Sequence, residues 1–135
     1  MSKWRIMLDT NIVSHIMRYP ELKPAEHMAG YAPDELAISS VVLAELLFGA
    51  VRVESSKLRK QIDFVLQTTA VLQFDEGAAA HYAQIRTDLE RAGTPIGGND
   101  LLIAAHARYL GATLVTDNIR EFSRVPDLSL ENWLD

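Results

Sequence analysis

The stretch RIMLDTNIVSHIM, residues 5–17, decides the fold class because it joins two different hydrophobic patterns at a single acid. Residues 5–8, RIML, form a short apolar run of the kind that makes a buried strand. Residues 10–17, TNIVSHIM, have the spacing of a helix with one apolar face. Asp9 stands between them, where a strand would end and a helix would begin.

The same alternation continues along the rest of the chain. Four further β-rich runs are expected to be strands: LAIS (36–39), AVLQF (70–74), TLVT (113–116) and LSLEN (128–132). Longer segments with helical spacing separate them, at 41–51, 56–68, 76–92 and from about 99 to 110. Strands that alternate with helices predict an α/β fold, with a mainly parallel central sheet flanked by helices. A length of 135 residues and 48% hydrophobic content fit a single domain over residues 1–135.

Composition removes several classes of function. The chain has no cysteine, which excludes disulfides, thiolate nucleophiles and Cys-ligated zinc. Its four histidines show no HxxxH or HExxH spacing, so a His-ligated zinc site has little support. No apolar run approaches the roughly 18 residues of a membrane span, and the N-terminus lacks the pattern of a signal peptide. We therefore expect a cytoplasmic protein that does not enter a membrane.

Four acids occupy unusual positions. Asp9 and Asp117 each directly follow a predicted strand, and the carboxyl ends of parallel strands meet at one edge of a sheet. Glu45 interrupts the apolar face of the helix at 41–51, where a lone carboxylate is costly. Asp100 stands at the start of a very apolar helix. These positions predict that the four acids converge at one end of the sheet.

Each acid also has an ordinary structural interpretation. Asp9 could cap its helix, either Asn99 or Asp100 could cap the next, and Asp117 could belong to a turn. Glu45 could form a buried ion pair with an arginine such as Arg86. These interpretations remain open for each residue taken alone.

Taken together, clustered carboxylates favour a hard divalent cation, Mg²⁺ or Mn²⁺, and such sites commonly serve phosphodiester chemistry. The formal net charge of −5 would otherwise argue against a nucleic-acid substrate. Setting the four acids aside leaves 14 of the 18 acidic residues against 13 lysines and arginines. The acidity of the chain therefore lies largely in the predicted site.

Three stretches carry a resemblance that covers nearly the whole chain. They are MLDTNIVSHIM (7–17), ISSVVLAELLFGA (38–50) and the segment from GTPIGGNDLLIAAHARYLG to the closing ENW (93–133). In their order and spacing they resemble a PIN domain, specifically the VapC-type toxin ribonucleases of bacterial toxin–antitoxin pairs. The last stretch is the most specific, because an acid, an apolar helix, a strand, VTDN, REF and ENW follow one another in it.

The resemblance implies that Asp9, Glu45 and Asp100 hold the metal ion, with Asp117 as a fourth acid. Thr10, Asn11 and Thr116 stand beside these acids and are expected to orient carboxylates or bound water. The implied activity is Mg²⁺- or Mn²⁺-dependent endonucleolytic hydrolysis of RNA, which would inhibit translation and growth.

The resemblance also implies partners. These are a VapB-type antitoxin, a second copy of the chain in a homodimer, and a toxin–antitoxin hetero-oligomer. The implied RNA substrate is a transfer RNA. Some toxins that this sequence resembles cut initiator transfer RNA in the anticodon stem-loop. The residues expected to contact phosphate are Arg86, Arg120, Lys57, Arg59 and Lys60.

Two other functions stay open at this point. One is a noncatalytic α/β module that binds a protein or an RNA and uses the acids as caps. The other is a different metal-dependent phosphoesterase, because acids alone do not distinguish phosphoester substrates. The five basic residues could equally form a solvated charged face.

Overall fold

The computed structural model describes residues 4–134 and contains one sheet of five parallel strands. The strands are β1 (Ile6–Leu8), β2 (Leu36–Ser39), β3 (Ala70–Leu72), β4 (Thr113–Val115) and β5 (Leu130–Glu131). Their order across the sheet is β3-β2-β1-β4-β5, with Met7 at the centre opposite Ala37 on one side and Leu114 on the other. The predicted α/β class and the parallel sheet are confirmed.

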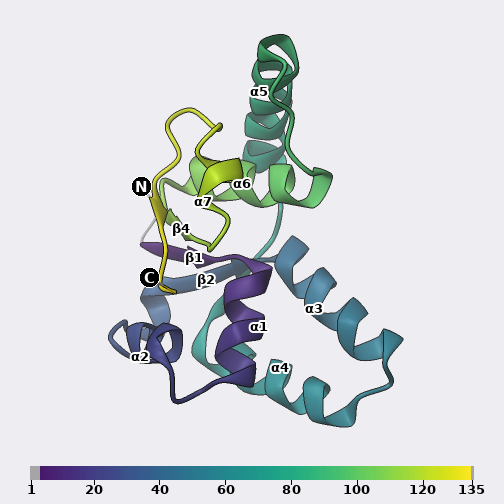
Figure 1. Cartoon of the computed structure of the whole chain (residues 1–135), viewed down its shortest axis with the longest axis vertical. Helices are drawn as coiled ribbons and strands as arrows, with labels where there is room; N and C mark the ends of the chain where they lie inside the picture. Colours follow the sequence, from purple (N-terminus) through teal and green to yellow (C-terminus); the bar gives the residue numbers. More distant parts are fainter. Residues whose placement is uncertain (1–3, 135) are drawn as a thin grey trace.

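Seven α-helices and one short 3₁₀ helix connect the described strands. They are α1 (Thr10–Arg18), α2 (Lys23–Ala29), η1 (Pro33–Glu35), α3 (Ser40–Arg52), α4 (Ser56–Thr68), α5 (Glu76–Ala92), α6 (Gly98–Leu110) and α7 (Ile119–Phe122). In Figure 1, α1, α3 and α4 gather in the lower half of the view, while α5, α6 and α7 lie together in the upper half. Buried strand residues such as Met7, Ile38 and Leu114 form the core between them.

Local chemistry explains where these helices begin and end. Ser39 and Ser55 cap α3 and α4, because their hydroxyls accept hydrogen bonds from backbone N–H groups of the first turn. Gly93 and Gly111 end α5 and α6 with φ of 72° and 67°, a left-handed conformation that suits glycine. The predicted bounds of the helices at 56–68 and 76–92 are confirmed to the residue.

Other boundaries differ from the expectation. Helix α6 starts at Gly98, and Gly97 is its N-cap residue without a side-chain bond, so the interpretation of Asn99 or Asp100 as a cap is wrong. Helix α2 was not expected, because seven residues of which just Pro24 is buried leave no apolar periodicity. The 3₁₀ helix η1 and the four-residue α7 were not expected either. Within residues 4–134 no helix is long and apolar enough to cross a membrane.

Candidate active site

The carboxyl edge of the two central strands gathers the first part of the site. Asp9 directly follows β1 and donates its backbone N–H to Val115 O on β4 at 3.0 Å. Thr116 and Asp117 follow β4 directly, so they lie beside Asp9. Thr116 is fully buried and Asp9 is 4% exposed, whereas Asp117 is exposed. The edge therefore has a buried acid next to a solvent-facing one.

Asp9 serves both as a helix cap and as a member of the acid cluster. Its Oδ1 accepts a hydrogen bond from Ile12 N at 2.9 Å, which starts α1. Burial raises the pKa of Asp9 to about 6, against the lowering effect of hydrogen bonds from Thr116 and Ile12. The charges of Asp117 and Asp100 raise this pKa further. The carboxylate is thus oriented by two donors but lacks a counter-charge.

Asp100 comes to the same edge on the first turn of α6. Burial raises its pKa to about 6, and the nearby charges of Glu121 and Glu45 add to the rise. A Cβ atom built on Gly97 would lie 3.8 Å from Asp100 Oδ2 and 3.8 Å from Glu121 Oε1. Both carboxylates therefore border the bare backbone of Gly97, with no side chain between them at that point.

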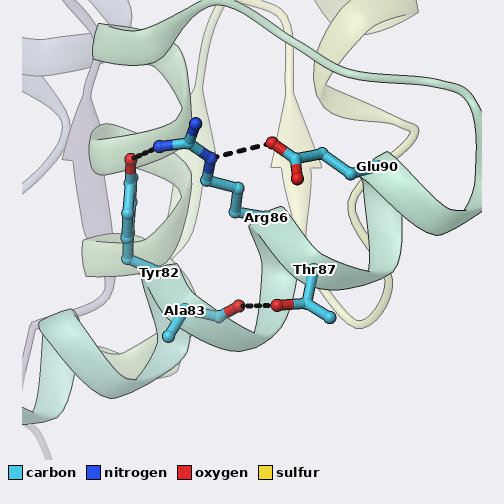
Figure 2. Close-up of polar contacts among 5 residues, drawn as sticks. All are labelled: Tyr82, Ala83, Arg86, Thr87 and Glu90. Atoms are coloured by element: carbon cyan, nitrogen blue, oxygen red, sulfur yellow. Dashed lines mark hydrogen bonds and ion pairs between the residues drawn. The ribbon is translucent and has the colours of Figure 1, made fainter.

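Glu45 reaches the site from α3 and is held by two neutral donors. Thr10 Oγ1 donates to its Oε1 at 2.6 Å, and Asn99 Nδ2 donates to its Oε2 at 3.2 Å. The alternative ion pair with Arg86 is wrong. Figure 2 shows Arg86 on α5, where Nε contacts Glu90 Oε1 at 2.9 Å and Nη1 donates to Tyr82 at 2.8 Å.

Glu121 is a fifth acid of the site that sequence reasoning missed. It accepts hydrogen bonds from Gly97 N and from Asn118 Nδ2, each at 2.8 Å, and these bonds lower its pKa. It thereby joins α7 to the loop before α6. An acid four residues after Asp117, in the REF segment, was the available signal. Its contact spans 24 positions of sequence and could not be read from spacing.

Two of the three polar residues expected to orient the acids do so. Thr10 donates to Glu45, and the hydroxyl of Thr116 donates to Asp9 while accepting from Asn118 N at 3.0 Å. Asn11 is exposed and its side chain has no such bond among the described residues. Its role stays a prediction.

The basic residues expected to contact phosphate are scattered over several elements. Lys57, Arg59 and Lys60 lie on α4, where Arg59 Nε is 3.4 Å from Asp63 Oδ1. Arg86 is engaged on α5, and Arg120 is exposed on α7. A contact of these residues with RNA stays a prediction.

The acids of this edge are not neutralised by the protein itself. Within residues 4–134, no lysine or arginine forms an ion pair with Asp9, Glu45, Asp100 or Asp117. In the same part of the chain, no three histidine or acidic side chains stand close enough together to hold a metal ion as they are. The donors are nevertheless all oxygens with mutually repelling charges, a set whose chemistry fits Mg²⁺ or Mn²⁺.

Known proteins resemble this chain in sequence and in fold. The family profile described as PIN domain matches residues 6–128. "Ribonuclease VapC2" of Rickettsia felis is 44% identical over 132 residues, covering 94% of this chain and 96% of that protein. The "tRNA(fMet)-specific endonuclease VapC" of Shigella flexneri is 39% identical over 135 residues, covering 96% and 98%. The crystal structure of VapBC2 from Rickettsia felis bound to a promoter DNA fragment includes a similar chain, with TM-score 0.84, 38% identity and coverage of 95% and 98%.

Proposed function

Because the chain belongs to the PIN-domain family, we propose that it is a VapC-type toxin: an endoribonuclease that hydrolyses phosphodiester bonds of RNA at the carboxyl edge of its sheet. One observation carries the proposal. Asp9 and Asp100 come from segments about ninety residues apart, yet burial raises the pKa of each to about 6, and the charge of Asp100 adds to the rise at Asp9. Neither acid has a cationic partner within residues 4–134. Such a pair destabilises the fold, and a catalytic use of the pair explains why it is there.

The proposed cofactor is Mg²⁺ or Mn²⁺, held by Asp9, Glu45 and Asp100, with Asp117 at the solvent side. When bound, such an ion supplies a more acidic water and offsets negative charge on the phosphate. The residues of the chain prepare for it. Thr116 and the Ile12 N–H fix the carboxylate of Asp9, while Thr10 and Asn99 fix that of Glu45. Their bonds hold the oxygens in place before any substrate arrives.

The proposed protein partner is a VapB-type antitoxin, supported by the similar chain found in the VapBC2 structure. An apolar groove of about 870 Å³ lies between α1, α2 and α4 and includes Met17, Met28 and Phe64. The side chain of Phe64 is 66% exposed, so a partner helix would bury it. A second copy of the chain is proposed as a further partner. Transfer RNA is the proposed substrate, because the similar protein of Shigella flexneri is a tRNA(fMet)-specific endonuclease.

The test uses protein purified free of antitoxin and incubated with total cellular RNA. Parallel reactions contain Mg²⁺, Mn²⁺ or EDTA, and new 5′ ends are mapped by sequencing. We expect discrete cuts that need the metal and are absent with the Asp9→Asn variant. Cuts that persist in that variant would point to a contaminating nuclease. No cuts, together with no Mn²⁺-dependent rise in melting temperature, would overturn the proposal in favour of a noncatalytic binding module.

A further inference from the structure

A second groove starts at the acid site and is lined by cations. It has a volume of about 440 Å³ and lies between α1, α3 and α4. Thr10 and Glu45, which are hydrogen-bonded to each other at the site, belong to its lining. Arg18, Arg52 and Lys57 also line it. We call it the basic groove.

The three cations of the basic groove are free to take an external anion. Arg18, Arg52 and Lys57 form no ion pair within the described residues 4–134. By contrast, Arg59 and Arg86 each have an acid on their own helix, as Figure 2 shows for Arg86. The groove therefore collects unpaired positive charge in a chain whose overall charge is −5.

The helices set the distance between these cations and the site. Thr10 and Arg18 stand on the same helix, so its rise of about 1.5 Å per residue places their backbones about 12 Å apart. Glu45 and Arg52 are separated on α3 by about 10 Å by the same rule. In Figure 1, α1 and α3 both start at the sheet near each other and diverge as they run away from it, with α4 across the bottom of the view between their far ends. The cations therefore lie farther along the groove than Glu45.

An exposed aromatic ring adjoins this charge. The side chain of Phe48 on α3 is 65% exposed, and the guanidinium carbon of Arg52 lies 5.5 Å from the centre of its ring. Cations along a groove with an aromatic face beside them are the elements that bind single-stranded nucleic acid, because phosphates meet the charge and bases stack on the ring. A double helix lacks the splayed bases that such a ring receives.

We propose that the basic groove binds the single-stranded part of the RNA substrate on one side of the cleaved bond. Arg18, Arg52 and Lys57 contact successive phosphates, and Phe48 offers a stacking face. The inference rests on the ribonuclease function proposed above and adds the path of the strand. Of the five basic residues predicted from sequence, it retains Lys57 and adds Arg18 and Arg52.

The first experiment measures RNA binding without cleavage. A labelled single-stranded RNA of about 12 nucleotides is titrated with the Asp9→Asn protein in EDTA, by fluorescence anisotropy at several salt concentrations. Adding Arg18→Gln and Arg52→Gln should weaken binding at least about 10-fold and lower the salt slope by about 1.4, because each phosphate contact on a single strand contributes about 0.7. The matched control carries Lys23→Gln and Arg91→Gln, which remove two exposed cations outside the groove lining.

The second experiment introduces a negative charge into the groove by substituting Gly49. Gly49 lines the groove inside α3, and a Cβ built on it meets no atom within 4 Å. Gly49→Glu should raise KM for a cleaved single-stranded RNA at least about 10-fold, by repulsion of phosphate. Gly49→Gln has the same size without the charge, so it measures the steric effect of a longer side chain in the groove, and KM in Gly49→Glu should exceed KM in Gly49→Gln at least about 10-fold. Both substitutions replace a helix-interior glycine, so the fold should be retained.

The outcomes separate this inference from the function on which it rests. Weaker binding in the Arg18→Gln and Arg52→Gln variant but not in its matched control, with KM higher in Gly49→Glu than in Gly49→Gln, supports the inference. Wild-type affinity in every variant, while the wild type cuts RNA, overturns the groove and leaves the ribonuclease standing. If the groove variants bind RNA as the wild type does but are no longer inhibited by an antitoxin, the groove binds a protein and the inference is overturned. RNA binding through the groove by a chain that never cuts would support the groove and overturn the nuclease.

Discussion

The two ends of strand β1 hold charges in opposite ways. At its start, Arg5 Nη1 lies 2.8 Å from Glu35 Oε2, and Glu35 also accepts a bond from Ala32 N at 3.0 Å. These contacts lower the pKa of Glu35, the Ala32 bond first and the Arg5 bond second. At the other end, burial and neighbouring acids raise the pKa of Asp9 to about 6. Glu35 at the start of β1 is therefore paired with a cation, whereas Asp9 at the other end has no cationic partner.

This difference shows which end of β1 lowers the stability of the fold for the sake of function. At the paired end, Arg5 and Glu35 neutralise each other within the chain. At the acid end, the charge of Asp9 has no partner, so a cation that binds there stabilises the folded state. Substitutions at the two ends should therefore differ in kind. Acid-end variants should change chemistry and stability in opposite directions, while paired-end variants should change neither by much.

The largest expected effect is on catalysis. Asp9→Asn or Asp100→Asn should lower the rate of RNA cleavage by at least about 100-fold, because each removes a charged oxygen from the proposed metal site. Single-turnover cleavage with Mn²⁺ measures the rate, and circular dichroism checks the fold. Glu35→Gln, an acid removed from the paired end, is the control and should cleave at the wild-type rate. A variant at either aspartate that keeps a tenth of the rate would break the comparison.

The next effect is a gain of stability when Asp9 loses its charge. Asparagine caps helices as well as aspartate does, so Asp9→Asn keeps the start of α1. In EDTA we expect a gain of about 2 kcal/mol above pH 6, since a shift of the pKa from 3.8 to about 6 is worth at most about 3 kcal/mol. This is roughly a 30-fold change in the unfolding equilibrium.

The sign of this gain depends on pH. A raised carboxyl pKa means that the wild type loses stability as pH rises from about 4 to about 6, whereas the variant has no such loss. The difference between them should therefore vanish near pH 4. Urea unfolding at several pH values measures it. A variant less stable than the wild type at pH 7.5 would show that Asp9 is satisfied within the protein.

A smaller effect is expected at Glu121. Its charge raises the pKa of Asp100 more than the charge of Glu45 does, so Glu121→Gln should lower that pKa. Carbon-detected NMR titration of the Asp100 carboxyl in EDTA measures the change. The glutamine oxygen can still accept the Gly97 N–H, so the loop before α6 should stay in place. An unchanged Asp100 titration would remove Glu121 from the acid cluster.

The smallest effect is expected at the paired end. The Arg5 side chain is 66% exposed, so its ion pair with Glu35 is screened by solvent. Arg5→Gln should leave the rate of RNA cleavage unchanged. It should lower the thermal unfolding midpoint only slightly at low salt and not at all at high salt. Thermal unfolding at low and high salt tests this. A large loss of stability that salt does not change would mean that the ion pair at the start of β1 is not merely a solvent-screened surface contact.

Sequence patterns predicted the elements with strong local signals. The helix at 76–92 has a repeating apolar face, an aspartate cap at Asp75 and a left-handed glycine at Gly93, so its bounds were correct. Helix α2 lacks such signals, because it buries almost nothing of its own. Strand β5 is shorter than the run at 128–132, since pairing with β4 reaches just Leu130 and Glu131.

The candidate site was predictable where topology alone brings residues together. Asp9 and Asp117 follow neighbouring parallel strands, so their meeting could be foreseen. Glu121 could not, because its bond to Gly97 depends on how two loops fold over each other. The ion pairs of the arginines could not be predicted either. An arginine on a helix can contact an acid one turn away instead of a substrate, as Arg59 contacts Asp63.

The strand order β3-β2-β1-β4-β5 also governs when the site can exist. Of the five described strands, the central strand β1 is synthesised first, but its neighbour β4 is made about a hundred residues later, as the pairing of Met7 with Leu114 shows. Asp9 therefore meets Asp100 and Thr116 only after about a hundred further residues have been made. A nuclease built in this order cannot attack RNA before α6 and β4 have been synthesised. Synthesis of these later elements is itself the step that assembles the site.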